Sequence, residues 1–575
     1  MSVRQTAENE KFDVAVLRYK CRKIMKVNDI VDFVAEDYGN AETVGVAGGV
    51  TVFVPFLCVG ERAKVKINHV KGNVAYGDVV TVVERSPKRE EPRCPYYGVC
   101  GGCALMHMKY AEQLSFKQRK VQRNLTKIGK LDGVEVGRCV PSPHVFAYRN
   151  KLSLPVSGTV GNVKIGMYKR GTHEVVDMNN CLLGGLWSKK LVELFRDYLN
   201  QNEIAPYDEK TFGGEVRHIV ARYIDGQLLA VVVSNGEFVH DLTEFYDTLS
   251  KNFDKVGLFV NINSGKNNVI LGKITRHIAG LRYIESTHLG TTFRLRPDSF
   301  FQVNNEVKNA IYTQVRQMID VADTEVLVDC FSGVGVLTNV LCSDAYDTYA
   351  VEIVPSAVKD ADEMAALNHS PRLTNILGDA NEVLPRLTTQ NAGKRMTLVV
   401  DPPRKGLGEG ICNTICKANF NNVAYISCDS ATLARDLSML TSRFEVLSAT
   451  PYDMFPNTDQ VETLVVLSKK IPDSHINIDV EFGEGEGQFS LKKIKERAEA
   501  RKPKEKVTYK MIQEYIEKTY GFKVHTAYIA EVKRDLGLPM YDAPNAVEEL
   551  KRPRAHPTPK MAKAIKETLK HFEII

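Results

Sequence analysis

The feature that most constrains the fold is a repeated order of apolar strand, glycine-containing turn and helix between residues 292 and 470. Strands that alternate with helices predict a parallel, doubly wound sheet. Ligands bind such sheets at the carboxyl ends of the strands, so this edge should carry the functional site. The five predicted strands are residues 325–330, 348–352, 374–377, 396–401 and 422–428.

The turn after the first of these strands has the composition of a cofactor loop. The strand ends near Asp329, and a Gly-Val-Gly turn follows. Such a turn lets the backbone approach a ligand closely, and Glu352, at the end of the second strand, could accept both ribose hydroxyls. The third glycine of the dinucleotide fingerprint is missing, which weakens the case for NAD. Asp329 suits the amino group of an amino-acid-like ligand and Asp379 suits an adenine amine, so the pattern favours S-adenosylmethionine.

Two further strand ends carry groups that could act on a substrate. Asp401-Pro402-Pro403-Arg404 ends the fourth strand, and Arg404 stands where amino-group methylases have an aromatic residue. Cys428 ends the fifth strand, and Glu462 follows downstream. A lone cysteine at a strand end is most often part of a core. A thiol and a carboxylate beside a cofactor fold instead indicate covalent chemistry on an electrophilic ring.

Four other cysteines form a second group. Cys94, Cys100 and Cys103 are closely spaced, and Cys181 lies far downstream. Zinc is more often bound by two Cys-x-x-Cys pairs, whereas three clustered thiolates and one remote thiolate suit a cubane [4Fe–4S] cluster, so zinc is the alternative. The remaining cysteines are predicted to pack in cores: Cys21, Cys58, Cys139, Cys330, Cys342, Cys412 and Cys416.

Length and composition describe a multidomain α/β protein. A chain of 575 residues exceeds one core, and its net charge of +6 permits a polyanionic partner without requiring one. Twelve cysteines are too few for a disulfide scaffold of this length, the N-terminus lacks a signal-peptide pattern, and no apolar run reaches membrane-spanning length. We therefore expect a cytoplasmic protein with no membrane partner. No obligate protein partner is indicated.

The chain is predicted to divide into six parts. Short apolar runs broken by glycines indicate an OB-like β-barrel near the N-terminus, whose Lys64, Lys66 and Lys71 either contact nucleic acid or face solvent on a structural barrel. The expected parts are an N-terminal segment (1–26), the barrel (27–88), a central α/β domain with the cysteine group (89–290), the doubly wound domain (291–470), a charged linker (471–506) and a small helical extension (507–575).

Helices outside the main sheet are predicted in two places. A helix within residues 104–130 is expected to pack on the doubly wound domain, and its basic residues are spread around it and should face solvent. In the tail, residues 511–520 and 526–536 have helical character, either as a helix-turn-helix or as two simply packed helices. A last amphipathic helix is expected to end at residue 575.

In order and content, these motifs resemble the RNA uracil-5-methyltransferase family. Ser299–Asn304 resembles the family's entry to the catalytic domain, Thr432–Asp436 follows the cysteine, and Phe455-Pro456 precedes the glutamate. The barrel resembles the TRAM domain, and the cysteine spacing resembles the iron–sulfur branch. The resemblance covers about residues 27–470, and Gln460 stands where many members have histidine. It implies these contacts to S-adenosylmethionine: Gln302, Phe331, Glu352, Asp379 and Asp401.

The resemblance implies methylation of carbon 5 of a uridine. That carbon is too weak a nucleophile to take a methyl group from a sulfonium unless a thiolate first adds to carbon 6. Cys428 would be the nucleophile and Glu462 the base that removes the carbon 5 proton, with Asp401 and Arg404 positioning the ring. The implied substrate is an unstacked uridine of 23S rRNA. Transfer RNA is the alternative, and an RNA-binding or assembly factor with a vestigial catalytic domain is a third possibility.

Overall fold

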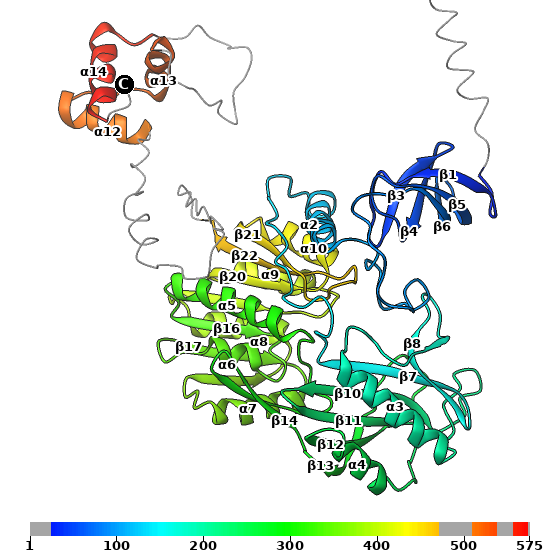
Figure 1. Cartoon of the computed structure of the whole chain (residues 1–575). Helices are drawn as coiled ribbons and strands as arrows, with labels where there is room; N and C mark the ends of the chain where they lie inside the picture. Colours follow the sequence, from blue (N-terminus) through cyan, green and yellow to red (C-terminus); the bar gives the residue numbers. More distant parts are fainter. Residues whose placement is uncertain (1–24, 471–508, 537–555, 573–575) are drawn as a thin grey trace, which may run out of the picture. The chain divides into compact units, whose positions relative to one another are not determined.

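A computed structural model describes residues 25–470, 509–536 and 556–572 (Figure 1). The predicted doubly wound sheet is confirmed. Its seven strands lie in the order β18-β17-β16-β19-β20-β22-β21, and the first five are parallel. The strands are β16 (Val326–Cys330), β17 (Asp347–Glu352), β18 (Leu373–Leu377), β19 (Met396–Val400), β20 (Phe420–Ser427), β21 (Phe444–Tyr452) and β22 (Glu462–Lys469).

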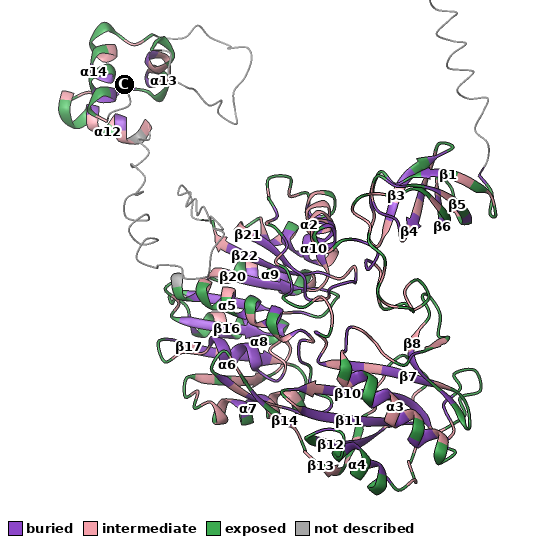
Figure 2. Ribbon diagram, in the orientation of Figure 1, coloured by how far each residue is buried: buried purple, intermediate pink, exposed green. Residues whose placement is uncertain are grey.

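Helices cover both faces of this sheet, and Figure 2 shows that the strands between them are largely buried. One core joins the sheet to α5 (Asn305–Val321), α6 (Val336–Leu341) and α7 (Pro355–Leu367). The other core joins it to α8 (Ala380–Gln390), α9 (Gly408–Lys417), α10 (Ser430–Leu440) and the distant α2 (Tyr110–Lys127). This is a Rossmann-like architecture, in which strand ends and helix starts meet at one edge.

The central region contains a second seven-stranded sheet, in the order β13-β12-β11-β10-β7-β8-β9. Its buried strands β10 and β11 pair antiparallel. Strand β11 pairs parallel with β12, and the connection between these two strands contains α4. The elements are β7 (Lys151–Thr159), β8 (Asn162–Tyr168), β9 (Val175–Asp177), α3 (Leu186–Gln201), β10 (Val216–Ile224), β11 (Gln227–Ser234), α4 (Thr243–Ser250), β12 (Lys255–Ile262) and β13 (Ile274–Gly280). The hairpin of β14 (Ile284–His288) and β15 (Thr291–Leu295) follows.

The N-terminal β-rich region is a six-stranded sheet in the order β1-β5-β6-β4-β3-β2. Alternating apolar residues of its strands fill one core, while Lys66 and Lys71 are exposed and Lys64 forms an ion pair with Asp32 at 2.7 Å. Its strands are β1 (Ile30–Val34), β2 (Asp37–Tyr38), β3 (Glu42–Ala47), β4 (Val50–Pro55), β5 (Arg62–Lys71) and β6 (Val74–Glu84).

The helix expected within residues 104–130 corresponds to α2, which packs against α10. The prediction that its basic residues face solvent is wrong for several of them. The Lys117 side chain is fully buried against Asp453, and Lys120 is 13% exposed beside Asp459. Arg123 donates to the carbonyl oxygens of Tyr38 and Gly39. These cations pair with groups far away in sequence, which a helical periodicity cannot reveal.

The C-terminal unit is separate, and its described residues form three helices. It contains α12 (Tyr509–Tyr520), α13 (Thr526–Asp535) and α14 (Pro559–His571), which bury Ile512, Ile516, Ile529 and Ile565 among their core residues. The predicted linker at 471–506, the N-terminal segment up to residue 24 and the last residues of the final helix lie outside the described ranges. No helix within those ranges is long and apolar enough to cross a membrane.

Candidate active site

The carboxyl ends of the parallel strands carry a tight turn. Phe331 and Gly335 both have left-handed backbone conformations, with φ of 66° and 80°. A glycine tolerates this conformation without cost, whereas Phe331 holds it because its N–H donates to the carbonyl oxygen of Val351 at 2.9 Å. The turn then enters α6, whose N-terminal N–H groups face the edge of the sheet.

Two acidic side chains predicted to hold a cofactor are ordered by backbone groups. The Glu352 carboxylate accepts from Gly333 N at 3.0 Å and from Val354 N at 2.8 Å, so it ties the two neighbouring turns together. Asp379 caps α8, accepting from Asn381 N at 2.8 Å. Each carboxylate has about four acceptor positions, so both could also bind hydroxyl or amino groups of a ligand.

Two aspartates lie at the carboxyl ends of β16 and β19, at the centre of the sheet: Asp329 is buried within β16, and Asp401, half-buried, directly follows β19. Burial raises the pKa of Asp329 to about 7, although a hydrogen bond from the Thr338 hydroxyl acts in the opposite direction. Burial likewise raises the pKa of Asp401 to about 7, against a hydrogen bond from Gln302 Nε2 at 3.4 Å. Tyr312 of α5 is buried near both, and its pKa is raised well above its usual value by burial first and then by these carboxylates.

Strand register places Cys428 and Glu462 opposite each other. In the antiparallel pair of β20 and β22, Ser427 is the partner of Thr463. Continuing that register by one position sets Cys428 across from Glu462, where neighbouring strands are roughly 5 Å apart. Cys428 is partly exposed and immediately precedes Asp429, which caps α10 by accepting from two backbone N–H groups. The thiol therefore sits at a helix N-terminus, beside a buried carboxylate.

The electrostatic surroundings raise the pKa values of both groups. Burial, Glu462 and Asp401 raise the pKa of the Cys428 thiol to about 11, while Arg404 opposes them. Burial and Asp401 raise the pKa of Glu462 well above its usual value, again against Arg404. Oε1 of Glu462 is buried without a hydrogen-bond partner. A buried acceptor with no partner is costly, so this oxygen is available to a substrate atom.

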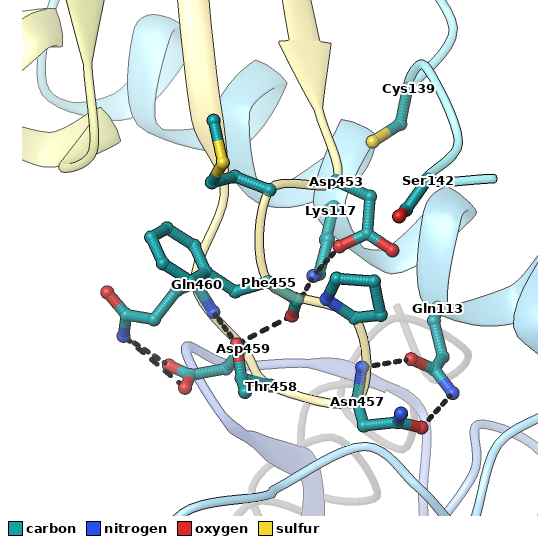
Figure 3. Close-up of polar contacts among 12 residues, drawn as sticks. Gln113, Lys117, Cys139, Ser142, Asp453, Phe455, Asn457, Thr458, Asp459 and Gln460 are labelled. Atoms are coloured by element: carbon teal, nitrogen blue, oxygen red, sulfur yellow. Dashed lines mark hydrogen bonds and ion pairs between the residues drawn. The ribbon is translucent and has the colours of Figure 1, made fainter. Parts of the chain in front are cut away.

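The loop before Glu462 is held by helix α2 (Figure 3). Lys117 Nζ contacts the Asp453 carboxylate and donates to the Phe455 carbonyl oxygen at 2.9 Å. Gln113 forms a reciprocal pair with Asn457, accepting from its N–H at 3.0 Å and donating to its Oδ1 at 3.3 Å. Five residues of two distant segments are thereby locked in one geometry. Sequence analysis missed these partners because they lie more than 330 positions apart.

The same loop is bonded to the segment that follows Cys103. The backbone N–H groups of Ala104 and Leu105 both donate to the carbonyl oxygen of Asn457 at 3.0 Å. Asn457 has a left-handed φ of 68°, which asparagine tolerates better than most residues. The loop also holds Arg404, whose Nη2 donates to Gln460 Oε1 at 3.0 Å. Gln460, which departs from the family's histidine, therefore keeps a role in positioning Arg404.

The four cysteines predicted to bind a cluster line one cavity. It has a volume of about 550 Å³, including space open to solvent, and Cys94, Cys100, Cys103 and Cys181 all border it. Arg149 borders it too, and its Nε is buried without a hydrogen-bond partner. Within the described ranges, however, no three histidine, cysteine or acidic side chains converge as the ligands of a metal ion would.

The structure thus brings the predicted residues together in two places. Gln302, Phe331, Glu352, Asp379, Asp401, Arg404, Cys428 and Glu462 lie at or beside the carboxyl edge of the main sheet. The four cysteines lie around the separate cavity. Tyr312 and the α2 contacts were not predicted. A buried tyrosine on an amphipathic helix gives no sequence signal that separates it from ordinary core residues.

Comparison with known proteins assigns the main sheet. Residues 283–470 match the family model described as tRNA (Uracil-5-)-methyltransferase. An uncharacterized RNA methyltransferase of Halalkalibacterium halodurans is 35% identical over 449 residues, covering 77% of this chain and 98% of the relative. A second, from Clostridium acetobutylicum, is 34% identical over 452 residues, with coverage of 77% and 98%.

A solved structure agrees over the same extent. The Pyrococcus abyssi tRNA (uracil-54, C5)-methyltransferase in complex with S-adenosyl-L-homocysteine is 25% identical. It aligns with a TM-score of 0.61 over 76% of this chain and all of that chain. The fold, the family match and the near-complete coverage of the curated relatives all indicate the same family. The chain belongs to the tRNA (uracil-5-)-methyltransferase family and is an S-adenosylmethionine-dependent RNA methyltransferase.

Proposed function

We propose that this enzyme methylates carbon 5 of a uridine in 23S rRNA, with Cys428 as nucleophile and Glu462 as base. The observation that carries the proposal is the pairing of Ser427 with Thr463 between β20 and β22, since one further position along this register Cys428 faces Glu462, and the Glu462 charge raises the pKa of the Cys428 thiol. Both stand at the sheet edge where the cofactor turn lies. A nucleophile and a base on adjacent strands can act on neighbouring ring atoms of one uracil.

The reaction proceeds in three balanced steps. The Cys428 thiolate adds to carbon 6, and the electron pair of the ring's double bond moves to carbon 5 as an enolate. Carbon 5 then takes the methyl group that S-adenosylmethionine supplies. Glu462 removes the remaining proton from carbon 5, and the electrons of that bond re-form the double bond and expel the thiolate. The unpartnered Oε1 of Glu462 supports the role of proton acceptor.

Other residues of the edge hold the reactants. We assign Glu352 to the ribose hydroxyls, Asp379 to the adenine amine, and Phe331 and Gln302 to the remainder of S-adenosylmethionine. Asp401, which lies within hydrogen-bond distance of Gln302, is shared between the cofactor and the uracil ring. Arg404 positions the ring, and its effect on the pKa of Cys428 favours the thiolate. The resemblance implies these cofactor assignments, and the position of Phe331, Glu352 and Asp379 at or just after strand ends of the parallel sheet supports them.

We propose that Cys94, Cys100, Cys103 and Cys181 hold a [4Fe–4S] cluster. A single tetrahedral zinc ion requires sulfur atoms roughly 3.8 Å apart, from Zn–S bonds of about 2.3 Å. Three closely spaced thiols and one remote thiol that border one cavity suit such a cluster. Methyl transfer needs no electron from such a cluster, whose role would be to hold this segment of the protein.

The choice of ribosomal RNA rests on the accessory parts. We propose that the catalytic domain at 291–470 is preceded by a TRAM-type barrel at residues 27–88 and a cluster-bearing central domain at 89–290. These accessory parts suit a large structured RNA substrate in the cytoplasm. Transfer RNA is the second candidate, favoured by the name of the matching family and of the archaeal structure. In either RNA the uridine must leave its stack, at a cost of a few kcal/mol.

Nucleoside mapping of a deletion strain tests the substrate. The proposal predicts loss of one or more 5-methyluridines from 23S rRNA and none from transfer RNA, with recovery on complementation by the wild-type protein. Loss from transfer RNA alone would contradict it.

Complementation by two cysteine variants separates an enzyme from a binding factor. Cys428→Ala should not restore the methyl mark, whereas Cys416→Ala, which removes a thiol on α9 away from the sheet edge, should restore it fully. An RNA-binding or assembly factor with a vestigial domain would complement equally well with both variants.

A further inference from the structure

The C-terminal unit carries a face of unbalanced positive charge. Residues 551–570 contain seven lysines and arginines and one acidic residue, Glu567. Four of these bases lie on α14 itself, and all four side chains are exposed: Lys560, Lys563, Lys566 and Lys570. At 100° per residue they fall on the side of α14 opposite Ile565 and Leu569, which enter the core.

Little within the unit neutralises this face. Among the described residues, Lys563, Lys566 and Lys570 form no ion pair with a carboxylate, and Lys560 lies over the Phe522 ring at 5.5 Å. Glu567 falls within the same arc of the helix, between Lys560 and Lys563, so the face holds four cations and one acidic group; the Glu567 carboxylate accepts from the Tyr520 hydroxyl at 2.8 Å. The lysine charges are therefore open to a ligand.

Helix stability does not account for this arrangement. Lys570 near the C-terminus favours the helix dipole, but Lys560 lies in the first turn, which contains no acidic residue, and opposes it. Lys563 and Lys566, and Lys566 and Lys570, are three and four residues apart, so like charges repel along the helix. Each of these features costs a few tenths of a kcal/mol. A bound polyanion would relieve all of them at once.

We propose that this face of α14 binds the phosphate backbone of the RNA substrate. RNA is the polyanion that an RNA methyltransferase meets, and the face spans about 15 Å between Lys560 and Lys570, from a rise of 1.5 Å per residue. Lysine acts on phosphate as a point charge, so the contact gives affinity without sequence specificity. Because the unit is covalently joined to the catalytic chain, RNA held here is at raised effective concentration for the active site.

The test uses the full chain with Lys560→Gln, Lys563→Gln, Lys566→Gln and Lys570→Gln combined. Glutamine is nearly as good a helix former as lysine, so circular dichroism should be unchanged. The matched control replaces the same four lysines by arginine, which keeps the charge. Binding to protein-free ribosomal RNA is measured by fluorescence anisotropy from 50 to 200 mM salt, and methyl transfer is measured on a short RNA oligonucleotide.

Loss of four phosphate contacts should reduce the salt slope of log K by roughly 2.8 to 3.6. The affinity advantage of the wild-type protein over the glutamine variant should then shrink by roughly 50- to 150-fold across that salt range. The arginine variant should bind like the wild type, and kcat on the oligonucleotide should be equal in all three. If the glutamine variant kept the RNA affinity and the salt slope of the wild type, the proposal would be overturned. A loss of binding to whole ribosomal subunits alone would not rescue it, since such a loss would indicate that α14 contacts a protein.

This inference rests on RNA as the substrate, but its test is independent of the proposed chemistry. If the wild-type enzyme formed no 5-methyluridine on any RNA, the proposed function would fail. The comparison of RNA affinities would still decide whether α14 contacts phosphate.

Discussion

The contact between Lys117 and Asp453 predicts how the loop before Glu462 is stabilised. Both side chains are fully buried, and Lys117 also bonds the Phe455 carbonyl oxygen. Lys117→Met keeps an unbranched side chain of good helix propensity but removes the ammonium. Asp453, whose Oδ2 already lacks a partner, would then be a buried charge with no compensation.

Breaking a buried ion pair in this way costs about 3–5 kcal/mol. Since each 1.4 kcal/mol is a factor of ten, local opening of the loop should become roughly 10²- to 4 × 10³-fold more frequent. Native-state hydrogen exchange reports that opening at the Asn457 amide, which bonds Gln113, and at the Thr458 amide, which bonds Phe455. Both amides should exchange faster by this factor, and methyl transfer should slow because Glu462 follows the loop.

Two matched variants separate this reasoning from a general loss of stability. Lys117→Met combined with Asp453→Leu leaves no unpaired charge, so it should recover at least half of the lost protection. Lys127→Met, on the exposed last turn of the same helix, should exchange like the wild type. If Lys117→Met alone left both amides within threefold of the wild type, the ion pair would not hold the loop and the reasoning would be refuted.

Three further predictions concern the two sites. Because the pKa of the Cys428 thiol is raised to about 11, its thiolate fraction increases tenfold per pH unit from pH 6 to 9, and the raised pKa values of Asp401, about 7, and of Glu462 act in the same direction. kcat/KM should therefore increase by at least tenfold per pH unit at the lower end of this range, and a flat profile would contradict this. Glu462→Gln should accumulate a covalent RNA adduct on denaturing gels, and an adduct level no higher than wild type would argue against its role as base. Cys181→Ser should lose iron and acid-labile sulfide after anaerobic purification, whereas stoichiometric zinc in the wild type would rule out the cluster.

Much of the main sheet could be predicted because its signals are local. Each parallel strand is a short apolar run followed by a turn, and the five predicted strands match the observed ones within two residues at each end. The site residues were located by the same reasoning, since strand ends of a parallel sheet meet at one edge. Cys428 and Glu352 could be placed there before any contact was known.

The remainder depended on long-range pairing, which one sequence does not encode locally. The antiparallel strands β21 and β22 were not predicted, yet β22 is the element that brings Glu462 beside Cys428. Lys117 was assigned to solvent because the bases of its helix show no stripe, and its true partner is 336 residues away. Gln460 was seen only as a departure from the family, and its contact with Arg404 emerges from the fold.

One substrate analogue tests whether Cys428 attacks carbon 6 of a uridine and Glu462 then removes the carbon 5 proton. In RNA that contains 5-fluorouridine, fluorine replaces that proton, so elimination cannot occur after methyl transfer. In the presence of S-adenosylmethionine, the wild-type enzyme should form a stable adduct that carries both the nucleotide and the methyl group. Peptide mass mapping should place it on Cys428. No adduct, or an adduct on another cysteine, would contradict the account.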